Sequence, residues 1–355
     1  MLRHNYILTA LLLSILCIGF TSCDKNLVFE NEGDCSPKVQ FVFKKHRQAL
    51  HQIEGRETDA FYSSVSSVHL FAFDKKTGEL VYDVKEKTEN LKSASELGLG
   101  SSADRCFMSL DLQPGVYTLV AWCGLDENDE NNAFRLAEST KASFKECHVK
   151  RDVNDVDPIH DSKYENLYHG RLETAEITVT SDASTIFTLE LTKNNNDIAV
   201  WVQHATANFE AGDFEVVYTD ANGTMKFDDN SVDNNEKLEY KSHSKSVLSS
   251  STEYNGETVD AGALVAHLST SRLMEKNAAD SRLEVRTKDG RVVFSIPFIK
   301  YVLQMQTFTD NSQYYLDCED TYNCSFYLTE IDGAWMPARI IINNWVLVPS
   351  QHDEI

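Results

Sequence analysis

Along most of the chain, apolar and polar residues alternate with a period of two, in short runs separated by turn residues. The clearest runs are Val39–Phe43, Val68–Phe73 and Val116–Trp122. This pattern is typical of strands with one buried face, because successive side chains point to opposite sides of a sheet. Only Leu91–Leu99 and Phe298–Met305 favour a helical turn. The pattern therefore predicts an all-β protein.

Turn residues divide the runs at several places. Asp74–Gly78 predicts a hairpin, and Pro114-Gly115 predicts a turn in which proline fixes φ and glycine tolerates a positive φ. The Asn-Gly pair in Asp220–Gly223 predicts a hairpin that returns through Met225–Phe227, and Asp289-Gly290 predicts another. Many short strands with such turns predict β-sandwiches with Greek-key connections.

The polar tract Asn194–Asp197 is the predicted domain boundary. A chain of 355 residues corresponds to about two domains. We therefore expect an N-terminal β-sandwich over 37–193 and a C-terminal β-sandwich over 194–355. Residues 228–260 are rich in Asp, Asn, Ser and Glu, which predicts a solvated excursion that carries an edge hairpin at most.

The N-terminus indicates export. The apolar run Tyr6–Phe20 spans about 22 Å as a helix, which is less than the hydrocarbon core of about 30 Å, so residues 1–22 are predicted to be a signal peptide. Small residues before Cys23 resemble a bacterial lipoprotein box, which predicts acylation of Cys23 and a lipidated tether over 23–36. The alternative is an ordinary signal peptide, with Cys23 a spare thiol.

Six further cysteines are candidates for disulfide bonds in an oxidising compartment. The spacing of Cys318 and Cys324 would allow a small closed loop, whereas the other four lie in the first half and could pair among themselves. No pair has the C-x-x-C spacing of a zinc or redox site. The six are Cys35, Cys106, Cys123, Cys147, Cys318 and Cys324.

The net charge and the sequence motifs limit the classes of function that fit this chain. The net charge of −22 disfavours nucleic acid as a partner, because such binding needs cations. The acidic stretch Asp126–Asn132 fails the calcium-loop pattern, with Asn131 and Ala137 at its sixth and twelfth positions. No nucleophile elbow, zinc helix or phosphate loop is present in the sequence, and no enzyme activity, metal or cofactor is predicted.

The order of several segments resembles the FimB/Mfa2 family of fimbrial anchor lipoproteins from Bacteroidales-type bacteria. The resemblance covers nearly all of the chain after Cys23, although Cys123 and residues 124–165 depart from it. Its segments are Gly33–Pro37, Val68–Asp74, Leu112–Tyr117, Ala121-Trp122, Leu167–Gly170, Leu191–Asn194, Ile296–Ile299 and Ile342–Trp345.

The resemblance implies two tandem transthyretin-like β-sandwiches without enzymatic activity. It also implies a lipid-anchored, surface-facing place in the outer membrane, where the protein holds the base of a fimbria and limits its length in cell adhesion. The implied partner is a fimbrial stalk subunit, joined by β-strand addition.

In this framework the first strand, with Val39, Phe41 and Phe43, is the candidate strand-exchange segment. Related stalk subunits are cut after an arginine that follows this strand. Arg47 and Arg56 lie where such a cut could fall. Because that cut would release the lipid, an anchor is expected to keep both arginines intact, or to keep the strand bound through a disulfide from Cys35.

Two alternatives stay open. The chain could be a polymerising stalk or tip subunit of the same superfamily, which would begin near residue 48 or 57 instead of at an acylated Cys23. It could also be a surface glycan-binding lipoprotein, with Trp335 or Trp201 as a sugar platform. For the four tryptophans, core packing is favoured over such a platform.

Overall fold

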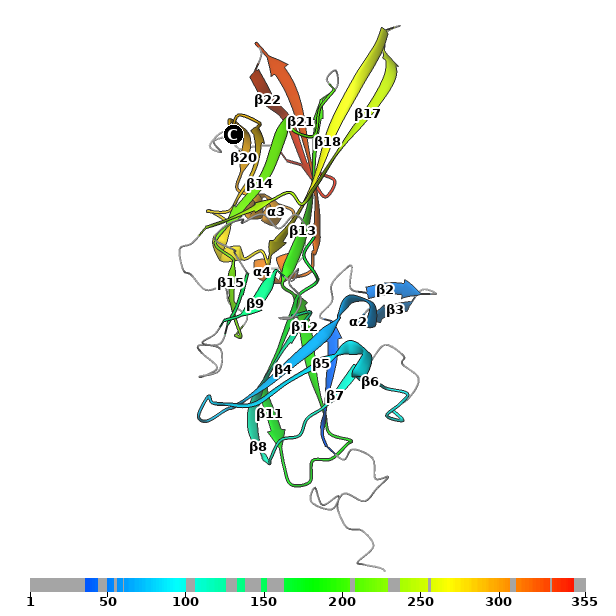
Figure 1. The fold of residues 1–355 in the computed structure, drawn as a ribbon, viewed down its shortest axis with the longest axis vertical. Coiled ribbons are helices and arrows are strands. Elements are labelled where there is room, and N and C mark those ends of the chain that lie inside the picture. The colour runs from blue at the N-terminus through cyan, green and yellow to red at the C-terminus, as the bar shows by residue number, and fades with distance from the viewer. Residues whose placement is uncertain are drawn as a thin grey trace, which may run out of the picture.

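The computed structural model describes most of the chain after residue 35, and it is mostly β, which confirms the predicted all-β class. Figure 1 shows two lobes arranged end to end. The described residues are 36–43, 50–53, 56–59, 61–99, 106–125, 133–137, 148–151, 163–204, 208–228, 237–254, 257–306, 311–332 and 334–347.

The N-terminal lobe is built on an eight-stranded sheet of order β5-β4-β8-β11-β12-β1-β7-β6. Helix α2 (Phe61–Ser64), a 3₁₀ turn (Thr88–Asn90) and the separate hairpin of β2 (Leu50–Ile53) and β3 (Arg56–Asp59) accompany it. The strands of the sheet are β1 (Lys38–Phe43), β4 (Ser67–Asp74), β5 (Leu80–Lys87), β6 (Lys92–Ser93), β7 (Cys106–Ser109), β8 (Gly115–Cys123), β11 (Tyr168–Ile177) and β12 (Ile186–Lys193).

The C-terminal lobe holds a six-stranded sheet, β17-β18-β13-β21-β22-β23, and a four-stranded sheet, β16-β14-β19-β20. The strands are β13 (Asn195–His204), β14 (Phe214–Asp220), β16 (Leu238–Lys241), β17 (Ser244–Tyr254), β18 (Glu257–Ser271), β19 (Arg282–Thr287), β20 (Val292–Ile296), β21 (Thr321–Ile331), β22 (Ala334–Ile342) and β23 (Trp345–Leu347). A 3₁₀ turn (Glu275–Asn277) and helices α3 (Phe298–Gln304) and α4 (Ser312–Asp317) complete it.

A three-stranded sheet lies where the lobes meet. It joins β9 (Phe134–Leu136) and β10 (His148–Arg151), from the first half of the chain, to β15 (Thr224–Lys226) from the second. The first half of the chain therefore contributes strands to both lobes.

The neighbouring strands β4 and β8 are buried on both faces. On one face, Leu70 and Leu119 belong to the core of the N-terminal lobe. On the other, Phe71 and Trp122 join the core that continues into the C-terminal lobe, where both rings lie beside Phe227 at centroid distances of 4.9 and 5.9 Å. The expected solvated face is thus an interface between the lobes.

Two predicted hairpins are confirmed. The Asp74 carboxylate accepts hydrogen bonds from the amides of Lys76 and Thr77, and Gly78 takes a φ of 75° between β4 and β5. Gly290 takes a φ of 83° between β19 and β20. In both turns glycine occupies the left-handed region that other residues avoid.

Two other turn predictions differ from the structure. The chain bends at Pro114 as expected, but Gly115 does not use a positive φ. It begins β8, where an added Cβ would lie 2.7 Å from the Tyr117 Oη. The Asn-Gly pair makes no hairpin, because β14 pairs with β16 and β19 while β15 pairs with β10. Instead, the buried Asn222 side chain donates to the carbonyls of Ser271 and Arg272.

Within the predicted excursion over 228–260, the described residues form a longer edge hairpin than expected. Its edge hairpin is long, with β17 of 11 residues paired to β18 of 15 residues. The hairpin forms one edge of the six-stranded sheet and projects beyond the body of the C-terminal lobe (Figure 1).

Asp220, at the end of β14, is a buried carboxylate whose pKa is raised to about 6, chiefly because burial disfavours its charge. It accepts hydrogen bonds from Tyr218, the amide of Ala221 and Asn277, which offset part of that cost. Between about pH 4 and pH 6, Asp220 is protonated in the native state and ionised in the unfolded state. The free energy of unfolding therefore falls as the pH rises from about 4 to about 6.

We therefore expect Asp220→Asn to gain stability relative to the parent chain over this pH range, by up to about 3 kcal/mol above pH 6. Urea unfolding at several pH values measures the difference. Asp280→Asn, at an exposed position, is the matched control and should show no such trend. If the unfolding free energies of Asp220→Asn and the parent chain differ by the same amount at every pH, the raised pKa of Asp220 is contradicted.

Candidate functional site

Strand β1 lies in the interior of the eight-stranded sheet, between two neighbours of opposite direction. Lys38–Phe43 pairs in parallel with Ile186–Leu191 of β12, and Lys38–Phe41 pairs antiparallel with Cys106–Ser109 of β7. At its start, Lys38 N donates to the Thr185 carbonyl at 2.9 Å. Both edges of β1 are therefore used within this chain.

The three predicted exchange residues share one face of β1 and are buried. Val39 and Phe41 are 0% exposed and Phe43 is 7% exposed. The Phe61 ring of α2 lies 5.9 Å from Phe41 and 5.8 Å from Phe43, and Tyr168 of β11 lies 4.7 Å from Phe43. Burying each such side chain contributes about 1.5–3 kcal/mol, so β1 is held mainly by its apolar face.

The opposite face of β1 is also buried. Lys38 is 2% exposed, and its ammonium donates to the Ser109 hydroxyl at 3.3 Å, while Gln40 is buried as well. Removal of β1 would leave the edges of β12 and β7 unpaired on either side of a strand-wide groove lined by Phe61 and Tyr168. The geometry is that of a groove filled by its own strand.

The two arginines and the proposed lipid site fall mostly outside this description. Cys23 and Arg47 lie outside the described residues. Arg56 is the first residue of β3 and pairs with Ile53 of β2. The acylation of Cys23 and the fate of both arginines stay predictions.

The described cysteines, Cys106, Cys123, Cys318 and Cys324, are thiols, so the predicted loop closed by Cys318 and Cys324 is not formed. Cys324 points into the core from β21, where burial raises the pKa of its thiol. Cys318 instead follows the last turn of α4, and its amide donates to carbonyls of that helix. The bond is absent because the two residues belong to different elements with different surroundings. Cys35 and Cys147 lie outside the described residues.

Cys106 and Cys123 are buried in the same core, on β7 and β8. Burial, together with the charge that Cys106 would carry, raises the pKa of the Cys123 thiol. Both therefore behave as core thiols in this structure.

The tract that predicts a domain boundary is buried and structured, not a loop. Strand β12 ends at Lys193, β13 begins at Asn195, and Asn194 is 1% exposed. Asn195 accepts from the Leu167 amide and donates to the Glu165 carbonyl. The chain thus passes from one lobe to the other as a nearly continuous strand fixed by asparagine side chains.

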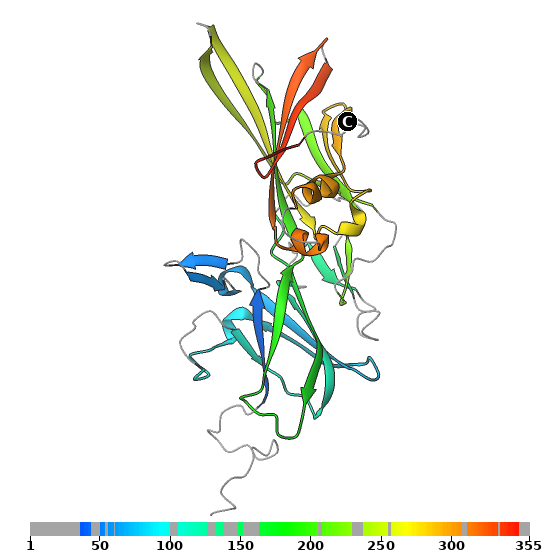
Figure 2. The same ribbon diagram turned by 180° about the vertical axis from the view of Figure 1, so that it is seen from behind.

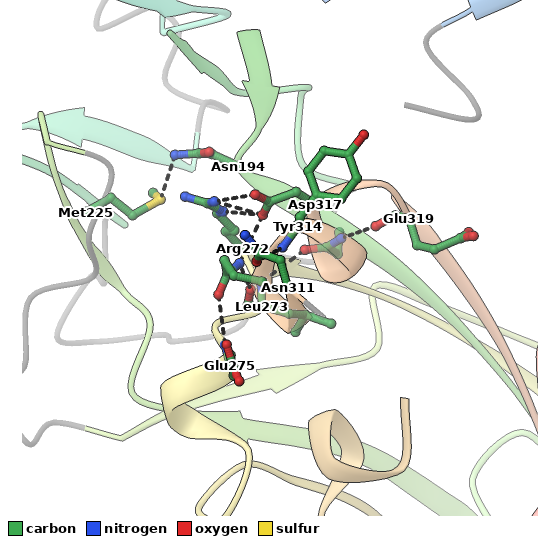
Figure 3. Close-up of polar contacts among 11 residues, drawn as sticks. Asn194, Met225, Arg272, Leu273, Glu275, Asn311, Tyr314, Asp317 and Glu319 are labelled. Carbon is green, nitrogen blue, oxygen red and sulfur yellow. Dashed lines mark hydrogen bonds and ion pairs between the residues drawn. The ribbon is translucent and has the colours of Figure 1, made fainter. Parts of the chain in front are cut away.

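A second group of contacts fastens the start of this strand to α4 (Figure 3). Asn196 donates to the Glu319 carbonyl and accepts from the Leu273 amide. Arg272, just after β18, donates its amide to the Asn194 carbonyl. Its guanidinium makes a two-point ion pair with Asp317 of α4, with Nε to Oδ1 at 2.9 Å and a second nitrogen to Oδ2 at 2.8 Å.

This Arg272–Asp317 pair is buried, with the side chains 6% and 5% exposed. Gln313 donates to Asp317 at 2.9 Å and to the Leu273 carbonyl at 3.1 Å. No sequence pattern indicates this pair, because its members are 45 residues apart and neither belongs to a recognisable motif.

The positions of the tryptophans do not favour a sugar-binding platform. Trp122 is fully buried, and Trp335 is edge-on to His204, Phe209 and Phe214 at 5.1–5.9 Å. Trp201 is half-buried on β13, and Trp345 is exposed on β23. Within the described part of the chain, no helix is long and apolar enough to cross a bilayer.

Solved structures of bacterial surface proteins share this fold. An adhesin candidate from Bacteroides thetaiotaomicron is 25% identical, with a TM-score of 0.68 over 90% of this chain and 99% of that one. An adhesin candidate from Bacteroides ovatus is 18% identical, with a TM-score of 0.67 over 94% of this chain and 100% of that one. The fold is therefore that of these adhesin candidates.

The fimbrial anchor protein Mfa2 from Porphyromonas gingivalis is similar, with 17% identity and a TM-score of 0.57 over 88% of this chain and 99% of that one. The minor fimbrium anchoring subunit Mfa2 of that organism is 21% identical over 333 residues, which are 93% of this chain and 90% of that protein. The family of fimbrillin-A associated anchor proteins Mfa1 and Mfa2 matches residues 31–350, and the chain belongs to it.

This membership confirms the resemblance found in the sequence. It supports the role of a fimbrial anchor subunit, implies interaction with other fimbrial subunits and suggests a location at the cell surface.

Proposed function

We propose that this protein is an outer-membrane lipoprotein, acylated at Cys23, that anchors the base of a fimbria and limits its length. Its two domains, 37–193 and 194–355, are proposed to be tandem transthyretin-like Greek-key sandwiches. The observation that carries the proposal is the position of β1, which fills its own groove from both edges.

A filled groove gives a physical reason for ending a polymer. In strand addition, the extended segment of one subunit pairs with the open sheet edge of another, and backbone hydrogen bonds supply much of the affinity. A subunit that keeps its own strand in place offers no open edge there. Addition at that groove stops at such a subunit, and the fimbria ends.

The buried face of β1 supports its retention. Displacing the strand would expose Val39, Phe41 and Phe43, each worth about 1.5–3 kcal/mol of burial, before an incoming strand could replace them. We therefore propose that the chain is not cut after Arg47 or Arg56, so that the lipid at Cys23 stays joined to the folded protein.

Crosslinking mass spectrometry on isolated outer membranes tests this function. An acylated Cys23 as the first residue, with the chain intact past Arg56 and crosslinked to a stalk subunit, is the expected result. A chain that begins after Arg47 or Arg56 and crosslinks to copies of itself would identify a polymerising stalk subunit instead. Binding on a glycan array, with no crosslink to a fimbrial subunit, would favour the glycan-binding alternative.

We expect Cys23→Ser to abolish acylation and to move the protein from the membrane to the soluble fraction, because no thiol remains at the proposed acylation site. Membrane fractionation followed by mass spectrometry of the N-terminal peptide measures both effects. Cys17→Ser, within the proposed signal peptide, is the control and should leave the lipid in place. Retention of lipid by Cys23→Ser would exclude Cys23 as the acylated residue.

A further inference from the structure

Among the strands that the structure describes, the six-stranded sheet of the C-terminal lobe has a gap in its middle beyond His204 of β13. Strand β13 pairs with β18 as far as His204 and Gly262, and with β21 as far as Gln203 and Tyr327. Its neighbours continue further, β18 toward Glu257 and β21 to Ile331. Beyond the end of β13, among the described strands, Glu257–Ala261 pairs only with β17, and Leu328–Ile331 pairs only with β22.

The two hairpins that border this gap diverge. Figures 1 and 2 show β17–β18 and β21–β22 separating beyond the end of β13, at the end of the molecule opposite the N-terminal lobe. Within the described residues, each hairpin presents an inner strand with one edge that no other strand pairs. An unpaired edge is a row of backbone donors and acceptors that another strand can complete.

A groove marks the base of the gap. It has a volume of about 380 Å³ and lies where β13 ends, between β17, β18 and β21. Small side chains on β18 leave room for another backbone to approach closely. The main lining residues are Gln203, Leu248, Ala261, Gly262, Ala263 and Tyr327.

The register places four of these residues in one row across the sheet. Leu248 pairs with Ala263, Ala263 with Gln203, and Gln203 with Tyr327. Leu248 is 49% exposed, although it is a large aliphatic side chain, and the Tyr327 ring lies 5.9 Å from the guanidinium carbon of Arg339. The row offers an apolar contact to the first side chain of an incoming strand.

The charge near the gap indicates what kind of strand fits. Glu330 and Asp332 are exposed at the end of β21, and the chain as a whole carries a net charge of −22. A segment with lysine or arginine is therefore favoured over an acidic one, because opposite charges steer association and set the register.

We propose that this gap is a strand-accepting site: an extended, positively charged segment of another fimbrial subunit continues the line of β13 and pairs antiparallel with Glu257–Ala261 of β18. This deepens the proposed anchoring function, on which the identity of the partner rests, by giving the anchor a joint separate from the β1 groove. The edge of β18 is favoured over the edge of β21, because the incoming segment would pair antiparallel with β18 and parallel with β21. Antiparallel ladders are slightly more stable than parallel ones.

A defined peptide tests the site on the mature chain in detergent. The probe is a short capped peptide in which valine alternates with lysine and threonine, and its counterpart carries glutamate in place of lysine. Hydrogen exchange should show slower exchange of the amides in residues 257–261 with the lysine peptide, by about tenfold or more, and no change with the glutamate peptide. Amides of β19 should be unaffected.

Leu248→Arg puts a cation into the groove on an exposed edge position, and it should weaken binding of the lysine peptide about tenfold or more. Val292→Arg, at a 53% exposed position on the other sheet, adds the same charge and should bind like the parent chain. Equal binding of both peptides, protection only on the outer edge of β17 or on β23, or self-association of the chain in place of peptide binding would overturn the proposal. Since the test needs neither lipid nor membrane, its outcome is independent of whether Cys23 is acylated.

Discussion

The Phe41→Ala variant is expected to lose about 3–5 kcal/mol of unfolding free energy, the usual cost of removing a buried aromatic ring. Phe41 is fully buried at the centre of β1, stacked on Phe61 and in register with Leu189 of β12. Its loss leaves a cavity beneath the strand that fills the groove. Urea unfolding of the mature chain measures the effect.

The same variant tests why the polymer ends. With β1 weakened, its groove should open to segments of other subunits, and fimbriae in cells carrying Phe41→Ala should be longer than in the parent. Ile186→Ala, on the neighbouring strand but 37% exposed, is the control and should cost less than about 1 kcal/mol and leave length unchanged. Fimbriae of normal length on cells with stably folded Phe41→Ala protein would contradict termination by β1.

The period-two pattern of the sequence locates the strands well, since it arises from the strands themselves. Val39–Phe43 and Val68–Phe73 both lie in strands. The helical turn predicted at Phe298–Met305 corresponds to α3, and Met305 is the residue directly after that helix. The period-two pattern could not assign the second face of β4. Phe71 looks like part of an alternating run, but its partner Phe227 lies more than 150 positions away, in the other lobe.

Local turn signals failed where tertiary contacts competed with them. Asn222-Gly223 has the composition of a tight hairpin, yet the Asn222 amide is used to hold the carbonyls of Ser271 and Arg272. Tyr240 also donates to its oxygen at 2.5 Å. Buried polar groups must be paired, and this need outweighed the turn preference.

The candidate site was predictable only in part. The apolar face of β1 follows from alternation, so Val39, Phe41 and Phe43 could be named in advance, although the exchange of this strand remains a proposal. The disulfide prediction failed for Cys318 and Cys324, because spacing along the chain does not reveal which element each side chain faces.

The lobe junction is where an anchor would have to resist tension. The chain crosses it as one nearly continuous strand, and its neighbours are Arg272 and Asp317 (Figure 3). Force applied between a lipid at the N-terminus and a partner at the C-terminal lobe would pass through this strand. The ion pair is therefore the most informative place to disturb the junction without touching either proposed joint.

The Arg272→Leu variant is expected to lose about 3–5 kcal/mol of unfolding free energy, because it leaves the Asp317 carboxylate buried without its cation. Arg291→Leu, which removes one partner of the exposed Arg291–Asp289 pair, is the control and should cost less than about 1 kcal/mol. Both are measured by urea unfolding.

The double variant Arg272→Leu, Asp317→Leu separates the charge from the packing. A buried pair replaced by apolar residues of similar size is often neutral, so the double variant should recover most of the stability that Arg272→Leu loses. If the double variant instead loses as much as the single variants Arg272→Leu and Asp317→Leu together, the pair is not coupled. The remaining hydrogen bonds, from Arg272 N to Asn194, between Asn196 and both Glu319 and Leu273, and from Gln313 to the Leu273 carbonyl, then hold this region together without it. Recovery by the double variant would mean that the cost of Arg272→Leu comes from the unmatched charge of Asp317 at the junction, and not from the loss of the ion pair itself.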